Sequence, residues 1–221
     1  MFSLHSFRTE YNALRLLMLR SSAMTFINKS LGLSVLTLTV ALSGAAMAKD
    51  TLIDVENARI GGFGGPVFKA SQIKNTETFE LGGMGGATFT TGKHSIMIGG
   101  GGYGLVNEIS WGVNTQLEMG YGGLMVGYTY NPEALIHVDT FLMLGAGGAS
   151  VIDSRNANNP EELGSFLVTE LTSQIEINVT DFMEVGIGAS YRLTTDPDIT
   201  GLSAADLSKP GVHISFQFGS L

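Results

Sequence analysis

Two short stretches of the sequence place a histidine next to a group that could take part in proton transfer. They are His137-Val138-Asp139 and His213-Ile214-Ser215. In a β-strand, residues two apart share one face. A carboxylate can then orient an imidazole, and a histidine can act as the base for a serine nucleophile. Both pairs also suit ordinary structural hydrogen bonds, which is the interpretation we favour.

Clusters of glycine recur along the chain, which contains 30 glycines in 221 residues. Gly99, Gly101 and Gly104 fit the spacing of a dinucleotide-binding loop, but that motif needs a helix directly after it and no helical pattern follows. We therefore predict no nucleotide and no other cofactor. Glycines that face the inside of a barrel would instead make room for large side chains opposite.

The elements that must position these residues show alternation with a period of two, which is typical of strands. From Leu167 to Val179, for example, branched apolar residues alternate with Glu170, Gln174 and Glu176. The same pattern predicts eight antiparallel strands: 59–69, 77–90, 94–106, 115–130, 135–150, 165–179, 182–195 and 210–219.

The connections between these strands alternate in length. The long ones are 70–76, 107–114, 151–164 and 196–209, and the other three are short. Short turns on one side and long loops on the other, with an even number of strands, are typical of outer-membrane barrels. The sequence therefore predicts an all-β fold with one up-and-down, eight-stranded, transmembrane-type barrel.

Aromatic residues gather near the expected strand ends, where a membrane barrel carries two girdles. We expect Phe68, Phe79, Tyr103, Phe166 and Tyr191 near the long-loop rim, and Trp111 in a long loop. Alternation by itself also fits a soluble, lipocalin-like barrel with its apolar face inside.

The first 48 residues are expected to be removed or to lie outside the barrel. Residues 24–48 carry a basic start, an apolar run and the small-residue site Ala46-Met47-Ala48, which together are typical of a secretory signal peptide. Residues 1–48 then form the leader and 49–221 the barrel. Without the leader the formal net charge changes from −8 to −11, which argues against a nucleic-acid partner. The chain has no cysteine.

With the apolar face outward, polar side chains would fill the narrow interior of an eight-stranded barrel. Because unpaired buried charges are costly, these groups should hydrogen-bond one another. We expect Arg192 to be the hub, paired with Glu176 and Glu184. We predict no catalytic or metal site, and a structural network made of Glu118, His137, Asp139, Glu170, Glu176, Glu184, Arg192 and His213.

The leader, the strands, the girdles and the closing segment Ile214–Phe218 resemble the small outer-membrane β-barrel proteins of the outer-membrane protein A/X type. The resemblance implies an outer-membrane location, contact with lipid, and recognition of the C-terminal strand by the barrel-assembly machinery. It favours a non-enzymatic role, structural or through contacts of the acidic loops 151–164 and 196–209 with an outside partner.

Two alternatives remain open at this point. One is the soluble periplasmic barrel with an apolar ligand. The other is a lipid-modifying hydrolase, because His213 and Ser215 resemble the His-x-Ser pair of outer-membrane lipid A deacylases. Those enzymes also use a downstream Glu, and no acidic residue follows Ser215.

Overall fold

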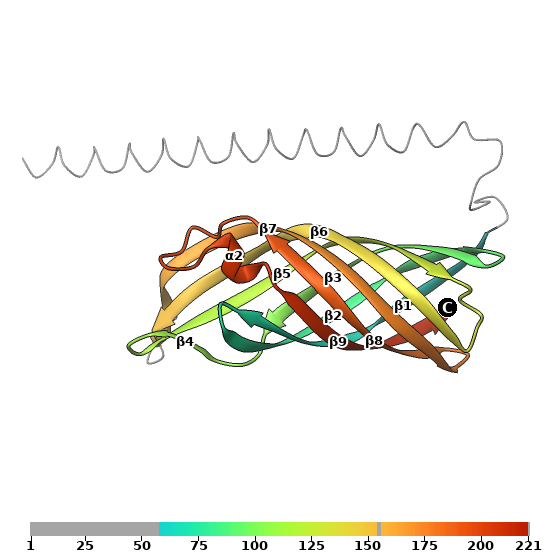
Figure 1. Cartoon of the computed structure of the whole chain (residues 1–221), viewed down its shortest axis with the longest axis horizontal. Helices are drawn as coiled ribbons and strands as arrows, with labels where there is room; N and C mark the ends of the chain where they lie inside the picture. Colours follow the sequence, from blue (N-terminus) through green and yellow to red (C-terminus); the bar gives the residue numbers. More distant parts are fainter. Residues whose placement is uncertain (1–57, 154–155, 221) are drawn as a thin grey trace, which may run out of the picture. The chain divides into compact units, whose positions relative to one another are not determined.

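The structure, a computed structural model, describes residues 58–153 and 156–220 and shows one closed β-barrel (Figure 1). The leader predicted for residues 1–48, with its signal at 24–48, lies outside the described residues. In the described part, no helix has the length and apolar character needed to cross a membrane. The barrel strands are β1 (Arg59–Ile73), β2 (Thr76–Thr91), β3 (His94–Leu105), β5 (Thr115–Tyr130), β6 (Ile136–Asp153), β7 (Asn156–Thr180), β8 (Met183–Thr194) and β9 (Pro210–Ser220).

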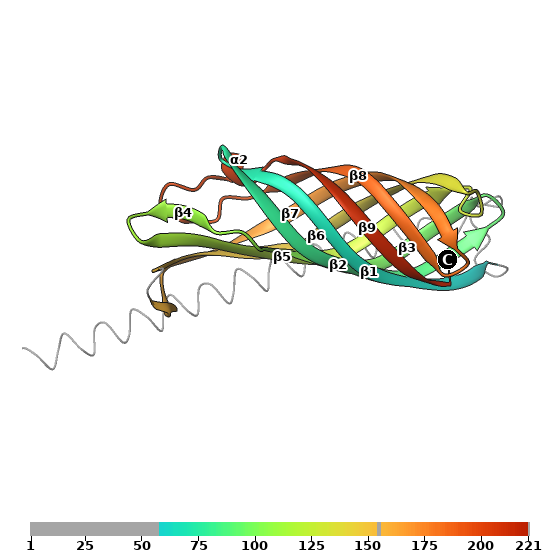
Figure 2. The same ribbon diagram turned by 90° about the horizontal axis from the view of Figure 1, so that it is seen from below.

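Each barrel strand pairs antiparallel with its neighbours around the ring, as an up-and-down barrel requires. Pairing of β1 with β9 and of β3 with β5 closes the ring. The short strand β4 (Ile109–Gly112) pairs with the start of β5 outside this ring. Figure 2 shows how steeply the strands are tilted. The predicted all-β, eight-stranded, up-and-down barrel is confirmed.

One end of the barrel carries the turns after β2, β5 and β7, and we call it the short-turn end. The other end carries the connections after β1, β3, β6 and β8, and we call it the long-loop end. Two of the predicted long loops are wrong, and a third, 107–114, contains the short strand β4. Segment 70–76 is mostly strand, with a turn at Lys74-Asn75, and 151–164 is mostly a hairpin extension of β6 and β7. Beyond the bilayer both faces of a hairpin can be polar, so the alternation that marks a membrane strand disappears.

The outer surface of the barrel is apolar. Leu124 is 74% exposed, Leu167 64% and Ile187 61%, whereas the neighbouring residues along each strand are turned inward. This surface suits lipid and contradicts the lipocalin-like alternative, which needs the apolar face inside. Further exposed members of the surface are Ile60, Phe68, Phe79, Leu81, Ile98, Val126, Tyr130, Val138, Leu142, Leu144, Leu171, Ile175, Phe182, Tyr191, Leu193, Val212, Ile214 and Phe218.

The interior is mixed rather than polar throughout. Methionines and aromatic residues form a buried core that includes Met97, Met125 and Phe141. Tyr103 and Phe166, expected in the girdle near the long-loop rim, are buried in this core as well. That expectation is wrong because a position near a strand end does not fix the face to which the side chain points.

Most of the glycines allow close approach within the barrel. At Gly127 an added Cβ would lie 2.7 Å from the Phe141 ring, so this glycine makes room for a large side chain, as expected. At Gly123 and Gly145, which are paired across β5 and β6, an added Cβ would lie 2.3 and 2.0 Å from a backbone oxygen of the neighbouring strand. Glycine is therefore required where tightly coiled strands meet.

Candidate functional site

Five side chains form a buried cluster in the half of the interior nearer the long-loop end, and we call it the arginine cluster. It contains two cations and two carboxylates that are all at most 3% exposed. Arg192 Nη1 lies 2.7 Å from Glu80 Oε1, and Lys69 forms an ion pair with Glu170. The charges balance within the cluster, which makes their burial tolerable. Its members are Lys69, Glu80, Tyr121, Glu170 and Arg192.

The Tyr121 hydroxyl joins the two ion pairs of the arginine cluster. It lies 2.9 Å from Glu80 Oε2, 2.8 Å from Glu170 Oε2 and 3.0 Å from Lys69 Nζ. A hydroxyl has one proton and two lone pairs, so it donates to one carboxylate at a time and accepts from the ammonium group. The ammonium group also lies 3.5 Å from the centroid of the Tyr103 ring, a cation–π contact.

Arg192 is a hub, but its partners differ from those predicted. Its ion-pair partner is Glu80, and its Nε donates to the backbone oxygen of Leu207 at 2.9 Å. The expected pairing with Glu176 and Glu184 is wrong. Eight residues separate 184 from 192 along β8, which amounts to about 26 Å at 3.3 Å per residue.

The connection 195–209 forms a cap over the long-loop end. Ile199, Leu202 and Leu207 are buried and join the core, and Leu207 ends the short helix α2 (Ala204–Leu207). Besides the contact of Leu207 with Arg192, the cap is held by the bond from the Lys74 amide to the Asp206 oxygen, at 3.0 Å. The predicted loop 196–209 is thus folded against the barrel, although Asp198 stays exposed.

His213 and Ser215 both lie inside the barrel and contact the same amide oxygen rather than each other. Oε1 of Gln174 accepts from His213 Nε2 at 2.8 Å and from Ser215 Oγ at 3.1 Å. Because an amide oxygen only accepts, Nε2 carries a proton and the serine proton points away from the imidazole. The geometry is therefore that of a structural hydrogen-bond group.

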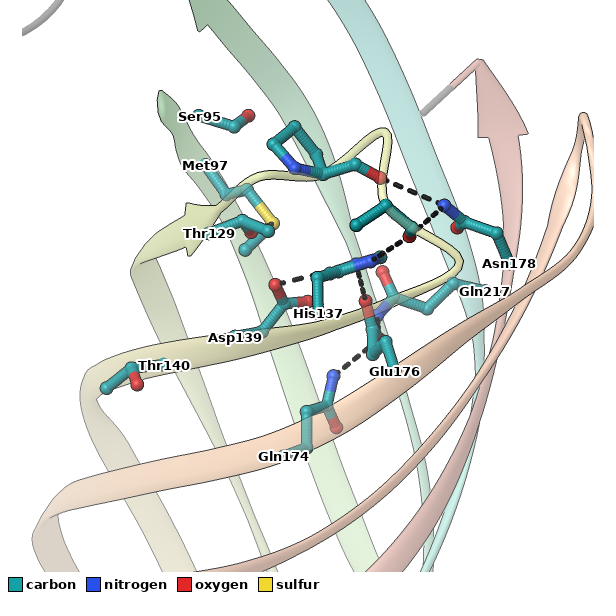
Figure 3. A network of polar contacts seen from close by, with 12 residues as sticks. Ser95, Met97, Thr129, His137, Asp139, Thr140, Gln174, Glu176, Asn178 and Gln217 are labelled. Carbon is teal, nitrogen blue, oxygen red and sulfur yellow. Dashed lines mark hydrogen bonds and ion pairs between the residues drawn. The ribbon is translucent and has the colours of Figure 1, made fainter. Parts of the chain in front are cut away.

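A second cluster lies near the short-turn end, and we call it the carboxylate cluster: His137, Asp139, Glu176 and Glu184. All four are buried, at 1–6% exposure. Figure 3 shows His137 between Asp139 and Glu176. Its Nε2 lies 3.3 Å from Glu176 Oε2 and 3.9 Å from Asp139 Oδ1. The cluster arises because β6, β7 and β8 are neighbours that all turn these positions inward.

Of the eight residues predicted for the interior network, the structure places seven inside the barrel and divides them among three groups. Glu118 is the exception, and its placement in the lumen is wrong: it is exposed, between the buried Leu117 and Met119. On β5 the inward positions are the odd-numbered ones. Glu118 lies close to the long-loop end, opposite Ser150 of β6, where the outer face need not be apolar.

The prediction missed Lys69 and Glu80, which complete the arginine cluster. A signal for both was present in the sequence, since Lys69 lies between Phe68 and Ala70, and Glu80 between Phe79 and Leu81. When apolar neighbours face lipid, the charged residue between them must face the interior.

Comparison with known proteins supports the fold. No protein-family model matches the sequence, and no curated protein is similar to it. Neisserial surface protein A, from Neisseria, is similar in structure over 74% of this chain and 98% of its own, with 10% identity and a TM-score of 0.51. The attachment invasion locus protein Ail of Yersinia pestis matches over 72% of this chain and 97% of its own, with 12% identity and a TM-score of 0.44. The N-terminal β-barrel domain of Pseudomonas aeruginosa OprF matches over 74% of this chain and 99% of its own, with 8% identity and a TM-score of 0.43. The likeness to the neisserial protein shows a shared fold, a small closed β-barrel, and the apolar exterior of this barrel suits contact with lipid.

Proposed function

We propose that the protein is a non-enzymatic outer-membrane barrel with a closed interior. Its role is either structural or to contact an outside partner through the long-loop end. The observation that carries this proposal is the combination of an apolar exterior with an interior occupied by the protein's own side chains. Eight strands leave room for little else.

The cap argues against an open pore. Ile199, Leu202 and Leu207 enter the core at the long-loop end, and the arginine cluster lies beneath them because Arg192 bonds to Leu207. An ion that passed through would have to displace both layers. We therefore expect the protein, reconstituted into planar bilayers, to give no steady conductance.

The buried position of His213 and Ser215 also supports a non-enzymatic role. An acyl chain of a membrane lipid runs along the outside of the barrel, whereas His213 and Ser215 are 5% and 0% exposed inside it. A lipid A mass spectrum should therefore be identical in cells that express the wild type or Ser215→Ala. A mass shift that the wild type produces and Ser215→Ala abolishes would contradict this proposal.

The proposed sidedness places the short-turn end in the periplasm and the long-loop end outside the cell, since outer-membrane barrels have short periplasmic turns. Acidic residues gather at the long-loop end, including Glu161 and Asp198, which are exposed. Glu162 instead accepts a bond from the Thr200 amide at 2.7 Å and so holds the cap to β7. A partner there would meet a negatively charged surface.

Fractionation tests the location. The full-length protein should pellet with outer membranes after carbonate extraction, and its band should shift on gels when the sample is heated. Release by osmotic shock would contradict the proposal. A protease added to intact cells should cleave a site engineered between Asp153 and Asn156, but not one engineered at Asn131. The reverse result would overturn the sidedness.

A further inference from the structure

We propose that the carboxylate cluster binds one first-row divalent metal ion inside the barrel, near its short-turn end. Nitrogen from His137 and carboxylate oxygens from Glu176 and Glu184 would be ligands, with Asp139 as the fourth protein ligand. Ligand atoms of His137, Glu176 and Glu184 all lie within 4.8 Å of one another. The 3.3 Å between His137 Nε2 and Glu176 Oε2 matches the edge of about 3.4 Å expected for two ligands each about 2.1 Å from a tetrahedral zinc ion.

The imidazole of His137 is already oriented as a ligand. Its Nδ1 lies 3.2 Å from the backbone oxygen of Ala134, and since a carbonyl only accepts, Nδ1 carries the proton. In the neutral imidazole, Nε2 then has the lone pair, on the side that faces the carboxylates. Metal-binding histidines are held in the same way, by a hydrogen bond from the other ring nitrogen.

Glu176 is oriented by its neighbours in a similar way. Its Oε1 accepts a hydrogen bond from Gln174 Nε2 at 2.6 Å and another from the Gln217 amide. This leaves Oε2 directed toward His137. The two side-chain amides thus hold one oxygen of Glu176 and leave the other oxygen for the cluster. Carboxylates that bind metal ions are hydrogen-bonded in a similar way.

Asp139 supplies an independent observation. The side chain is 1% exposed, and its Oδ1 has no hydrogen-bond partner among the described residues, although it lies 3.9 Å from His137 Nε2. A buried carboxylate oxygen without a partner is costly. A cation at the centre of the cluster would satisfy it.

Space and charge agree with a single small cation. A cavity of about 20 Å³ is lined by the four residues of the cluster and by hydroxyl groups of β2, β3 and β5, which is enough for one water molecule or ion. The cluster holds three carboxylates and one imidazole, and none of its contacts in the described part of the chain is a lysine or arginine. A divalent ion offsets most of that negative charge.

The mixture of ligands selects the class of metal. Imidazole favours zinc, copper, iron and nickel, whereas carboxylates also accept manganese and magnesium. One nitrogen and three oxygens therefore favour a first-row ion such as Zn²⁺ over Mg²⁺. The donors lie on three neighbouring strands, so the ion would link β6, β7 and β8 close to the turn that contains Ala134.

Zinc binding to the full-length protein tests this proposal. The protein, purified in detergent without a histidine tag, is dialysed against EDTA and titrated with ZnCl₂ by calorimetry, and bound zinc is then measured by elemental analysis. We expect one zinc per chain with a dissociation constant below about 10 µM, little competition from millimolar Mg²⁺, and a zinc X-ray absorption spectrum with one imidazole and several oxygen ligands. Absence of stoichiometric binding by the folded wild type would overturn the proposal and would mean that protons neutralise the cluster.

Variants locate the bound ion. His137→Gln should weaken zinc binding at least about tenfold, and so should Gln174→Ala, which removes a bond that orients Glu176. The matched control is His94→Gln, which removes another histidine at the same end, one that bonds Tyr128 at 2.7 Å and lies outside the cluster. Equal affinity in His137→Gln and His94→Gln would overturn the assignment. If His137→Gln does not fold, the zinc X-ray absorption spectrum of the wild-type protein decides. A spectrum without an imidazole signal excludes His137 as a ligand.

Discussion

Replacement of Arg192 by methionine should be among the most damaging single changes in the barrel. The side chain is 2% exposed and its partner Glu80 is also 2% exposed. Methionine keeps much of the volume but, among the described residues, leaves the hydroxyl of Tyr121 as the one side chain hydrogen-bonded to the Glu80 carboxylate. It also removes the bond to the Leu207 oxygen that holds the cap.

The expected loss follows from the burial of the pair. Removal of one partner of a buried ion pair costs about 3–5 kcal/mol, because the other charge stays in a medium of low polarity. At about 1.4 kcal/mol per factor of ten, this changes the unfolding equilibrium by roughly two to three and a half orders of magnitude. The double variant Arg192→Met/Glu80→Gln removes the stranded charge as well, and it should recover about 2 kcal/mol.

The assay is reversible urea unfolding of the full-length protein in phospholipid bilayers, followed by the heat-dependent gel shift. Fluorescence of Trp111, the single tryptophan of the sequence, gives a local signal at the long-loop end. Two results would refute the reasoning. One is an unchanged urea midpoint in Arg192→Met. The other is a double variant that is as unstable as the single variant, which would mean that Glu80 carries no stranded charge.

Three further predictions concern the strand contacts and the cap. Gly145→Ala should lower the free energy of unfolding by about 1–3 kcal/mol, since its Cβ would lie 2.0 Å from a backbone oxygen. The control is Gly104→Ala, whose added Cβ would have nothing within 4 Å and which should change the free energy of unfolding by less than about 0.5 kcal/mol. Equal urea midpoints for the two variants would count against the steric argument. Leu207→Ala should cost about 2–5 kcal/mol, because the side chain is fully buried, and should raise ion leakage in planar bilayers; unchanged leakage would show that the cap does not seal the end. The Ser203 hydroxyl and amide hold the pKa of Asp206 below its ordinary value, so this stabilisation of α2 is present at neutral pH and is lost as pH falls through the lowered pKa. Asp206→Asn should raise amide hydrogen exchange in α2 at pH 7 but hardly at pH 2, and equal effects at both pH values would contradict the assignment.

The barrel could be predicted because alternation is a local property of each strand. Where lipid covers one face, as at Leu167, Leu171 and Ile175, the pattern is strict and the strand count follows from it. Outside the bilayer this constraint ends. The extension of β6 and β7 to Asp153 and from Asn156 carries no such pattern, and a segment that forms a hairpin therefore resembles a loop.

The pairs within the interior could not be predicted in the same way, because they depend on register around the ring. Arg192 reaches Glu80, a residue 112 positions away in sequence, across strands that are not neighbours. Nearness in sequence favoured Glu176 and Glu184, which lie far along the barrel axis. The inward placement of Lys69 and Glu80 was predictable from their neighbours, whereas their partners were not.

The carboxylate cluster shows how one strand register determines both the fold and the candidate metal site. His137 and Asp139 lie two residues apart on β6, and Glu176 is paired with His137 across β6 and β7. A slip of one residue in β6 would turn both side chains toward lipid and bring Val138 inside. The register that keeps the apolar face outward is thus the one that brings the carboxylate cluster together. Since strands position side chains more accurately than loops do, a metal site of this kind needs no dedicated loop. It needs only that inward positions of three adjacent strands carry ligands at the same height, which is the arrangement at the short-turn end.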